Sequence, residues 1–385
     1  MVIMKQLIYA DNAATTKLDS NAFEAMTPYL LTEYGNASQP YSFSRSAKKA
    51  IKEARQIIAT CINADPEEIY FTSGGTESDN WAIKGSAFSD PEKREMITSS
   101  IEHHALLRSC SAINGLGYPV NYLGVSSDGI VSTSELANAI TPRTRLVSVM
   151  LVNNEIGTIQ PVRELCRIAH ANNAIFHTDA VQALGHIKVD VQELGVDMLS
   201  ASAHKFNGPK GIGFLYIRKG TQIAPWSDGG SQEFGLRAGT ENVAAIVGMA
   251  VALKKNCVSI DKHAMHLSVL EQALLSHLRR ANIDFIRNGG IHCAPGNISL
   301  SFKNTNGEAI LHCLDLMGIC VSTGSACDGD NTQVSHVLRA IALDDEYARG
   351  TIRVSLGKEN TLDDVIRIAD SLMKILNSKR FSASS

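Results

Sequence analysis

One lysine occupies a position in this sequence where it could act as a nucleophile. Lys205 ends the segment Ser202-Ala203-His204-Lys205, which follows a short apolar run and precedes a turn that begins at Gly208. The ε-amine of a lysine becomes nucleophilic when burial or a cationic neighbour lowers its pKa. A lysine just after a buried strand is therefore a candidate for forming a Schiff base. The alternative is a solvated loop lysine, because surface lysines are common.

A glycine pair follows an earlier predicted strand. In Ser73-Gly74-Gly75-Thr76-Glu77-Ser78, two glycines and a hydroxyl open a predicted helix. This arrangement presents free backbone N–H groups and the helix dipole to a phosphate. The alternative is a plain strand-to-helix turn with Thr76 as the cap. The segment has neither the GxGxxG nor the GxxxxGK[ST] pattern, which disfavours dinucleotide and nucleoside triphosphate sites.

Two further predicted strands end in polar residues. Asn153-Asn154-Glu155 follows one of them, and Asp179 follows the next. A buried carboxylate needs a partner, which here is either an arginine or a protonated pyridine nitrogen. Parallel strands bring their carboxyl ends to one edge of a sheet, where α/β proteins bind cofactors. We expect these residues to gather at that edge.

Short apolar runs alternate with helix-period segments along the chain. The predicted strands of the first part span residues 68–72, 95–98, 145–152, 174–178 and 213–217. This βαβ alternation predicts a mainly parallel sheet covered by helices. An amphipathic stretch at 243–255 and a polar segment at 256–262 mark the predicted exit from this lobe, and strands at 297–302 and 351–356 predict an α+β lobe beyond it. A chain of 385 residues exceeds what one core usually supports, so two lobes are expected.

Composition narrows the class of protein. The chain has 36 Lys and Arg against 39 Asp and Glu, with 44% hydrophobic residues, so no charge excess attracts nucleic acid or lipid. The first residues lack the apolar core of a signal peptide, and no apolar segment is long enough to cross a bilayer. We expect a cytoplasmic enzyme without membrane or direct nucleic-acid partners. The eight cysteines form no CxxC pair, which indicates neither a metal site nor a disulfide framework, and most are expected to be reduced core thiols.

Taken together, these motifs resemble those of one family over essentially the whole chain. The chain is similar to cysteine desulfurases of the aminotransferase class V family, which are fold-type I pyridoxal-phosphate enzymes. The resemblance implies a large domain (16–255) with a mainly parallel seven-stranded sheet, and a smaller α+β domain (1–15 and 256–385) with a catalytic-cysteine loop. The matching segments, besides those above, are 9–16, 71–80, Glu102-His103, 152–157, 179–182, 237–242, 324–327 and 352–357.

The resemblance implies pyridoxal 5'-phosphate as the cofactor and assigns residues to it. Lys205 would form the Schiff base, Asp179 would bind the pyridine nitrogen, His103 would stack on the ring and Gln182 would bind the phenolic oxygen. The implied phosphate ligands are Thr76, the backbone of Gly75, Ser202, His204 and, from the neighbouring subunit of a homodimer, Thr240. Each has a plainer alternative: His103 as a cap or core histidine, Gln182 as a surface residue, His204 as a structural donor, and Thr240 as the cap of a helix starting near Glu241. The implied substrate ligands are Asn12, Ala13, Asn154 and Arg353. The planar guanidinium group of Arg353 can bind a carboxylate with two hydrogen bonds.

Cys327 decides which reaction follows. It lies between small Gly324-Ser325-Ala326 and a polar segment, which favours a thiol on a mobile loop over a buried core thiol. By resemblance, Cys327 attacks the sulfur of L-cysteine, alanine leaves, and a persulfide passes to an acceptor such as an Fe–S scaffold or a tRNA-thiolation protein. His103 would exchange protons with the thiols. The spacing from Cys327 to Ser335 resembles the longer loop of the NifS/IscS-like group. A selenocysteine lyase, another β-eliminating lyase, or a scaffold subunit are the alternatives.

Overall fold

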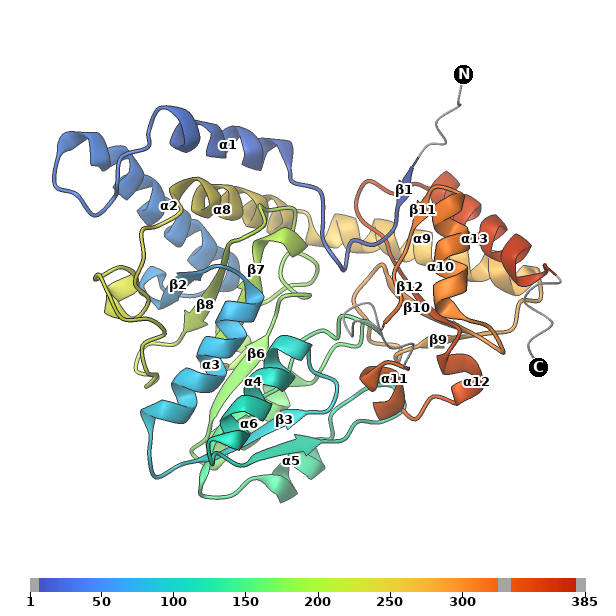
Figure 1. The fold of residues 1–385 in the computed structure, drawn as a ribbon, viewed down its shortest axis with the longest axis horizontal. Helices are drawn as coiled ribbons and strands as arrows, with labels where there is room; N and C mark the ends of the chain where they lie inside the picture. The colour runs from blue at the N-terminus through green and yellow to red at the C-terminus, as the bar shows by residue number, and fades with distance from the viewer. Residues whose placement is uncertain (1–6, 325–333, 379–385) are drawn as a thin grey trace.

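A seven-stranded sheet forms the centre of the larger part of the molecule (Figure 1). The computed structural model describes residues 7–324 and 334–378. The strand order is β2-β8-β7-β6-β5-β3-β4, and all neighbouring pairs from β7 to β4 are parallel, whereas β8 runs antiparallel to both of its neighbours. The strands are β2 (Ile69–Thr72), β3 (Glu95–Ser99), β4 (Val120–Leu123), β5 (Thr144–Ser148), β6 (Ile175–Asp179), β7 (Met198–Ser202) and β8 (Gly213–Ile217). The predicted mainly parallel sheet is confirmed.

Helices cover both faces of this sheet because successive strand residues point to opposite sides. Val147, Phe176 and Leu199 pack in one core, while Leu146 and Met198 pack in another. The first core is completed by α2 (Arg45–Ile62), α5 (Thr133–Ala139), α6 (Val162–Ala171) and α8 (Val243–Val258), and the second by α3 (Gly75–Ser89) and α4 (His104–Gly115). The remaining helices of this part are α1 (Ser20–Leu31) and α7 (Val191–Leu194).

A smaller group of elements has a hydrophobic core of its own, around Leu300, Ile352 and Ile368. Its antiparallel sheet has the order β12-β10-β9, and β1 pairs in parallel with β11. The elements are β1 (Ile8–Tyr9), β9 (Phe285–Asn288), β10 (Asn297–Phe302), β11 (Ile319–Cys320), β12 (Thr351–Ser355), α9 (Ile260–Arg280), α10 (Gly307–Leu316), α11 (His336–Ala340), α12 (Asp345–Ala348) and α13 (Leu362–Leu376). The N-terminal strand thus lies with late elements of the chain (Figure 1). The domain boundaries given above stay a prediction.

Three details differ from the sequence-based expectations. The polar segment at 256–262 is helical, because α8 runs to Val258 and α9 starts at Ile260 after a bend of 69°. The strand expected to reach 152 ends at Ser148. Of the described cysteines, Cys110 and Cys166 are buried but the others are half-buried. Within the described ranges, no single helix is long and apolar enough to cross a membrane, and the bent pair α8–α9 meets that test only when both helices are taken together.

Candidate active site

A cavity of about 290 Å³ lies at the carboxyl ends of β6 and β7, beside the start of α3. This is the edge at which parallel α/β sheets bind ligands. The predicted site residues that line it are Ala13, Gly75, Thr76, His103, Asn154, Asp179, Gln182, Ser202, His204, Lys205 and Arg353. Residues from both parts of the molecule therefore meet in one place, and the strand-end residues Asn154, Asp179 and Lys205 gather at one edge of the sheet as expected.

Lys205 lies one turn beyond β7, in the short 3-10 helix Ala203–Lys205. Its Nζ donates to the carbonyl oxygens of Ala13 at 2.6 Å and Ala14 at 2.8 Å. Gln182 Nε2 donates to the same Ala13 oxygen at 2.9 Å. The N-terminal segment thus closes over the lysine, and its backbone carbonyls hold the amine inside the cavity rather than in solvent.

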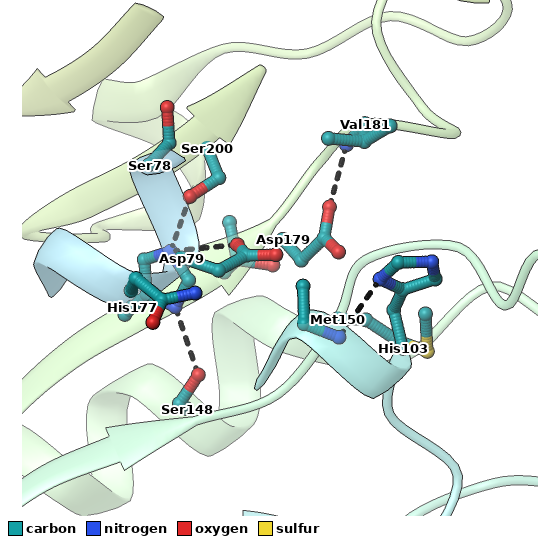
Figure 2. A network of polar contacts seen from close by, with 12 residues as sticks. Ser78, Asp79, His103, Ser148, Met150, His177, Asp179, Val181 and Ser200 are labelled. Carbon is teal, nitrogen blue, oxygen red and sulfur yellow. Dashed lines mark hydrogen bonds and ion pairs between the residues drawn. The ribbon is translucent and has the colours of Figure 1, made fainter. Parts of the chain in front are cut away.

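Asp179, the last residue of β6, is the buried carboxylate of the site. Its Oδ1 accepts from the Val181 N–H at 2.8 Å (Figure 2). Burial raises the pKa of Asp179 to about 6, against the opposing effects of the Val181 hydrogen bond and the Lys205 charge. A carboxyl group in this setting gains stability from a further cationic donor. The protonated nitrogen of a pyridine ring is such a donor, so the floor of the cavity fits pyridoxal phosphate.

The start of α3 fits a phosphate. Gly74 occupies the cap position with φ 150°, and it has no side chain to bond the first N–H groups. A Cβ at Gly75 would lie 2.7 Å from Val181 Cγ2, so bare backbone is needed at this close approach. Buried Ser202 ends the neighbouring β7. Thr76 lies inside the first turn, so the reading of Thr76 as the helix cap is wrong.

His103 both caps a helix and lines the cavity. Its Nδ1 accepts from the Ala105 N–H at 3.2 Å, as the N-cap of α4. Burial, reinforced by the charge of Lys205, lowers the pKa of His103 to about 4. The ring is therefore neutral, and because Nδ1 accepts, its proton is on Nε2. His103 can donate a hydrogen bond into the site. His204 also lines the cavity, and burial lowers its pKa to about 4.

Arg353 on β12 is held in place from two sides. Its Nη2 contacts Asp11 Oδ1 at 2.8 Å, and Nη1 donates to the Asn154 carbonyl oxygen at 3.0 Å. Its buried Nε has no hydrogen-bond partner within the described residues. A carboxylate in the cavity could satisfy this donor. Asp11 was not predicted as a site residue from the sequence, although a buried arginine needs a counter-ion and Asp11 lies in the matching segment 9–16.

Two predicted residues, Asn12 and Thr240, do not line the cavity. Asn12 Nδ2 donates to the Ser355 carbonyl oxygen at 2.9 Å, and Asn12 lines a neighbouring cavity. Thr240 is exposed on this chain and is not among the lining residues. It does not cap a helix, because α8 starts at Val243 with Asn242 as its cap, so that alternative is wrong. Cys327 lies outside the described residues.

The fold and the cavity define a class of protein, the fold-type I pyridoxal-phosphate enzymes. Sequence comparison matches the aminotransferase class-V family over residues 8–368. The cysteine desulfurase IscS of Dictyoglomus turgidum is 48% identical over 98% of this chain and 96% of its own length. A solved NifS-like protein has a TM-score of 0.91 at 38% identity, covering 96% of this chain and 99% of that one. The structure titled SspA in complex with cysteine has a TM-score of 0.81 at 37% identity, covering 91% of this chain and 98% of that one.

The chain belongs to the aminotransferase class-V family, and within it to the cysteine desulfurases, which depend on pyridoxal phosphate. The resemblance inferred from the sequence motifs is confirmed. The relatives do not favour the selenocysteine lyase alternative.

Proposed function

We propose that this cysteine desulfurase transfers the sulfur of L-cysteine to Cys327, with the cavity around Lys205 as its cofactor and substrate site. Lys205 would hold pyridoxal phosphate covalently, Asp179 would bind its ring nitrogen, and the start of α3 with Ser202 and His204 would bind its phosphate. When bound, the cofactor stores electron pairs released at the substrate carbons. The observation that carries the proposal is the shared cavity, in which a lysine, a buried carboxylate and an uncapped helix start meet.

Substrate binding is assigned to the other wall of the cavity. Arg353 offers its unpartnered Nε to the carboxylate of cysteine, while Asp11 and the Asn154 carbonyl keep the guanidinium in position. The substrate amine then lies toward Lys205. Because the guanidinium is charged and fixed before substrate binds, little side-chain entropy is lost on binding.

His103 is suited to donate a hydrogen bond to the reacting groups rather than to transfer a proton, because the N–H of a neutral imidazole is a very weak acid and a pKa of about 4 makes the ring a weak base. With a pKa near 4 and its proton on Nε2, it is a neutral donor at neutral pH. In the transfer step, the Cys327 thiolate forms a bond to the substrate sulfur, and the bond between that sulfur and the substrate β-carbon breaks. The β-carbon keeps the electron pair of the broken bond and gains one proton, which converts the CH2 of cysteine to the methyl group of alanine, while Cys327 keeps the sulfur as a persulfide.

We further propose that the persulfide is passed to an acceptor protein, such as an iron–sulfur scaffold or a tRNA-thiolation protein, and that the enzyme is a homodimer. Large apolar side chains are exposed around α1 and the loop that follows it: Phe23, Leu30, Leu31, Tyr34, Tyr41 and Phe43. Exposed apolar side chains gathered in one segment of the chain suit an interface with a second copy. The cytoplasmic location stays a prediction.

A Cys327→Ser variant tests the sulfur transfer. We expect it to bind pyridoxal phosphate and cysteine but to lose alanine and sulfide production by at least about 100-fold, because a hydroxyl does not replace a thiolate nucleophile. A Cys61→Ser variant is the control and should keep turnover, since half-buried Cys61 packs against the core at the end of α2. Undiminished turnover in Cys327→Ser would show that the reaction proceeds without this thiol.

A further inference from the structure

A second buried carboxyl group lies beneath the cavity, beside Asp179. Asp79, on α3, is 1% exposed and lines the same cavity. Figure 2 shows its carboxyl next to that of Asp179. Asp79 was not predicted as a site residue from the sequence, because its position resembles that of any polar residue in the first turns of a helix.

Asp79 stands at the end of a chain of polar side chains that crosses the sheet. Ser148 Oγ and His177 Nδ1 are 2.8 Å apart, and His177 Nε2 and Ser200 Oγ are 2.9 Å apart. The Ser200 hydroxyl also contacts the Asp79 carboxyl. The register of the strands aligns Ser148, His177 and Ser200. Ser148 on β5 pairs with His177 on β6, and Asp179, two residues further along β6, pairs with Ser200 on β7. Three adjacent buried strands, β5, β6 and β7, thus supply this row of hydrogen-bonded side chains.

No cation neutralises Asp79 within the part of the chain that the structure describes. His177 Nε2 is 3.9 Å from Asp79 Oδ1, but burial lowers the pKa of His177 to about 3, so the ring is neutral. Asp79 Oδ1 itself has no hydrogen-bond partner among the described residues. Asp179, in contrast, receives the Val181 N–H and faces the charge of Lys205.

Two adjacent buried carboxylates rarely both ionise, because each charge opposes the other. Burial and the negative charge of Asp179 raise the pKa of Asp79 well above its usual value, and the Ser200 contact only partly offsets this. Burial also raises the pKa of Glu102 to about 8. A proton shared at this site is therefore better placed on Asp79 than on Asp179, which has its own donors.

We propose that Asp79 is a positioning residue that stays protonated in the resting enzyme, so that Asp179 is the single charged carboxylate beneath the cofactor ring. This inference rests on the proposed role of Asp179 in binding the ring nitrogen. A protonated Asp79 also fixes which group donates each hydrogen bond in this row of polar side chains. Asp79 donates to Ser200, Ser200 donates to His177 Nε2, and His177 Nδ1–H donates to Ser148. An ionised Asp79 would accept from Ser200 and reverse every donor, placing the histidine proton on Nε2.

The protonation of Asp79 can be measured in the holoenzyme without relying on activity. In infrared spectra at pH 7, we expect a protonated-carboxyl C=O band that disappears in Asp79→Asn. Glu102→Gln is the matched control and should remove a different band. In ¹⁵N NMR with labelled histidine, the His177 signal, assigned by its loss in His177→Gln, should report the Nδ1–H form in both wild type and Asp79→Asn.

Cofactor affinity gives a separate readout of the proposed cofactor site. Asp179→Asn removes the carboxylate proposed to bind the ring nitrogen, so it should weaken cofactor affinity by about 30-fold or more. An Nε2–H form of His177, or infrared spectra in which Asp79→Asn removes no protonated-carboxyl band, would overturn the inference. Unchanged cofactor affinity in Asp179→Asn would instead contradict the proposed cofactor site, while the infrared result would still decide the state of Asp79.

Discussion

At the scale of single residues, the environment of each side chain decides its chemistry. Asp179 and Asp79 are the same residue type and their carboxyl groups lie next to each other (Figure 2), yet among the described contacts only Asp179 receives a backbone N–H and the charge of Lys205. His103 and His177 are both neutral because burial lowers their pKa values, but His103 faces the cavity whereas His177 is enclosed in the sheet. Residue type alone does not distinguish these roles.

The covalent role of Lys205 is tested by Lys205→Ala. We expect this variant to lose the visible absorbance of the bound cofactor, all turnover, and the label that borohydride reduction fixes on the wild-type protein, because no other group in the cavity offers a comparable amine. Mass spectrometry of reduced, digested protein locates the label. A label on a different lysine in the variant would contradict the assignment.

Arg353→Lys tests the carboxylate site. Lysine keeps the charge but lacks the fork of donors, so it cannot bond Asp11, the Asn154 carbonyl and a carboxylate together. We expect KM for cysteine to rise by about 10- to 100-fold, with a smaller change in kcat. Steady-state kinetics measure both constants. Asp11→Asn should give a smaller rise in KM, because it removes the carboxylate that holds Arg353 in position but leaves the guanidinium that binds the substrate carboxylate.

At the scale of elements, the turn between β2 and α3 and the N-terminal segment complete the site. The turn leads into α3, whose first N–H groups have no side-chain cap. The N-terminal segment places the carbonyl oxygens of Ala13 and Ala14 against the amine of Lys205. In both places the backbone makes the contact, which is compatible with the small residues found there, glycine at the start of α3 and alanine at 13 and 14.

Gly75→Ala tests the need for bare backbone at the start of α3. The added Cβ would lie 2.7 Å from Val181 Cγ2, which forces the turn or the valine to move. We expect cofactor affinity to fall by about 10-fold, measured by titration of the apoenzyme, while the protein stays folded by circular dichroism. Adding Val181→Ala should restore most of the affinity. No recovery in the double variant would mean that the loss has another cause.

At the scale of the whole molecule, the cavity described here lacks one predicted ligand. Thr240 is exposed and caps no helix, so it is available to a second copy of the chain. In the proposed homodimer, each Thr240 reaches the phosphate bound by its partner, and two-fold symmetry then gives two equivalent sites.

Mixing Lys205→Ala protein with Thr240→Val protein tests this shared site. A hybrid dimer would have one site with both defects and one with neither, so equal mixing should restore about a quarter of wild-type activity once subunits exchange. The assay uses a cofactor concentration at which the Thr240→Val parent is mostly inactive. Light scattering measures the oligomeric state. An active monomer, or no gain despite proven exchange, would contradict the shared site.

Much of the fold and the site could be predicted from the sequence because the patterns are local. A buried parallel strand gives a continuous apolar run, which located β6 and β7, and polar residues at their ends located Asp179 and Lys205. Short motifs also carried the family resemblance. The bend between α8 and α9 was missed, because the polar residues at 256–262 are compatible with a loop as well as with an exposed helix.

What the tertiary structure alone decided is which distant groups meet. Asp11 and Arg353 are far apart in the sequence, and their ion pair forms because the N-terminal chain pairs alongside β12. Asp79 became informative only when α3 placed it against β6, beside Asp179 and His177. Side-chain charge depends on burial and on neighbours from other elements, and neither is encoded in local spacing. The sequence by itself therefore determined the fold class and the family and singled out Lys205 as the candidate reactive lysine, and the packing of the elements determined the electrostatics around it.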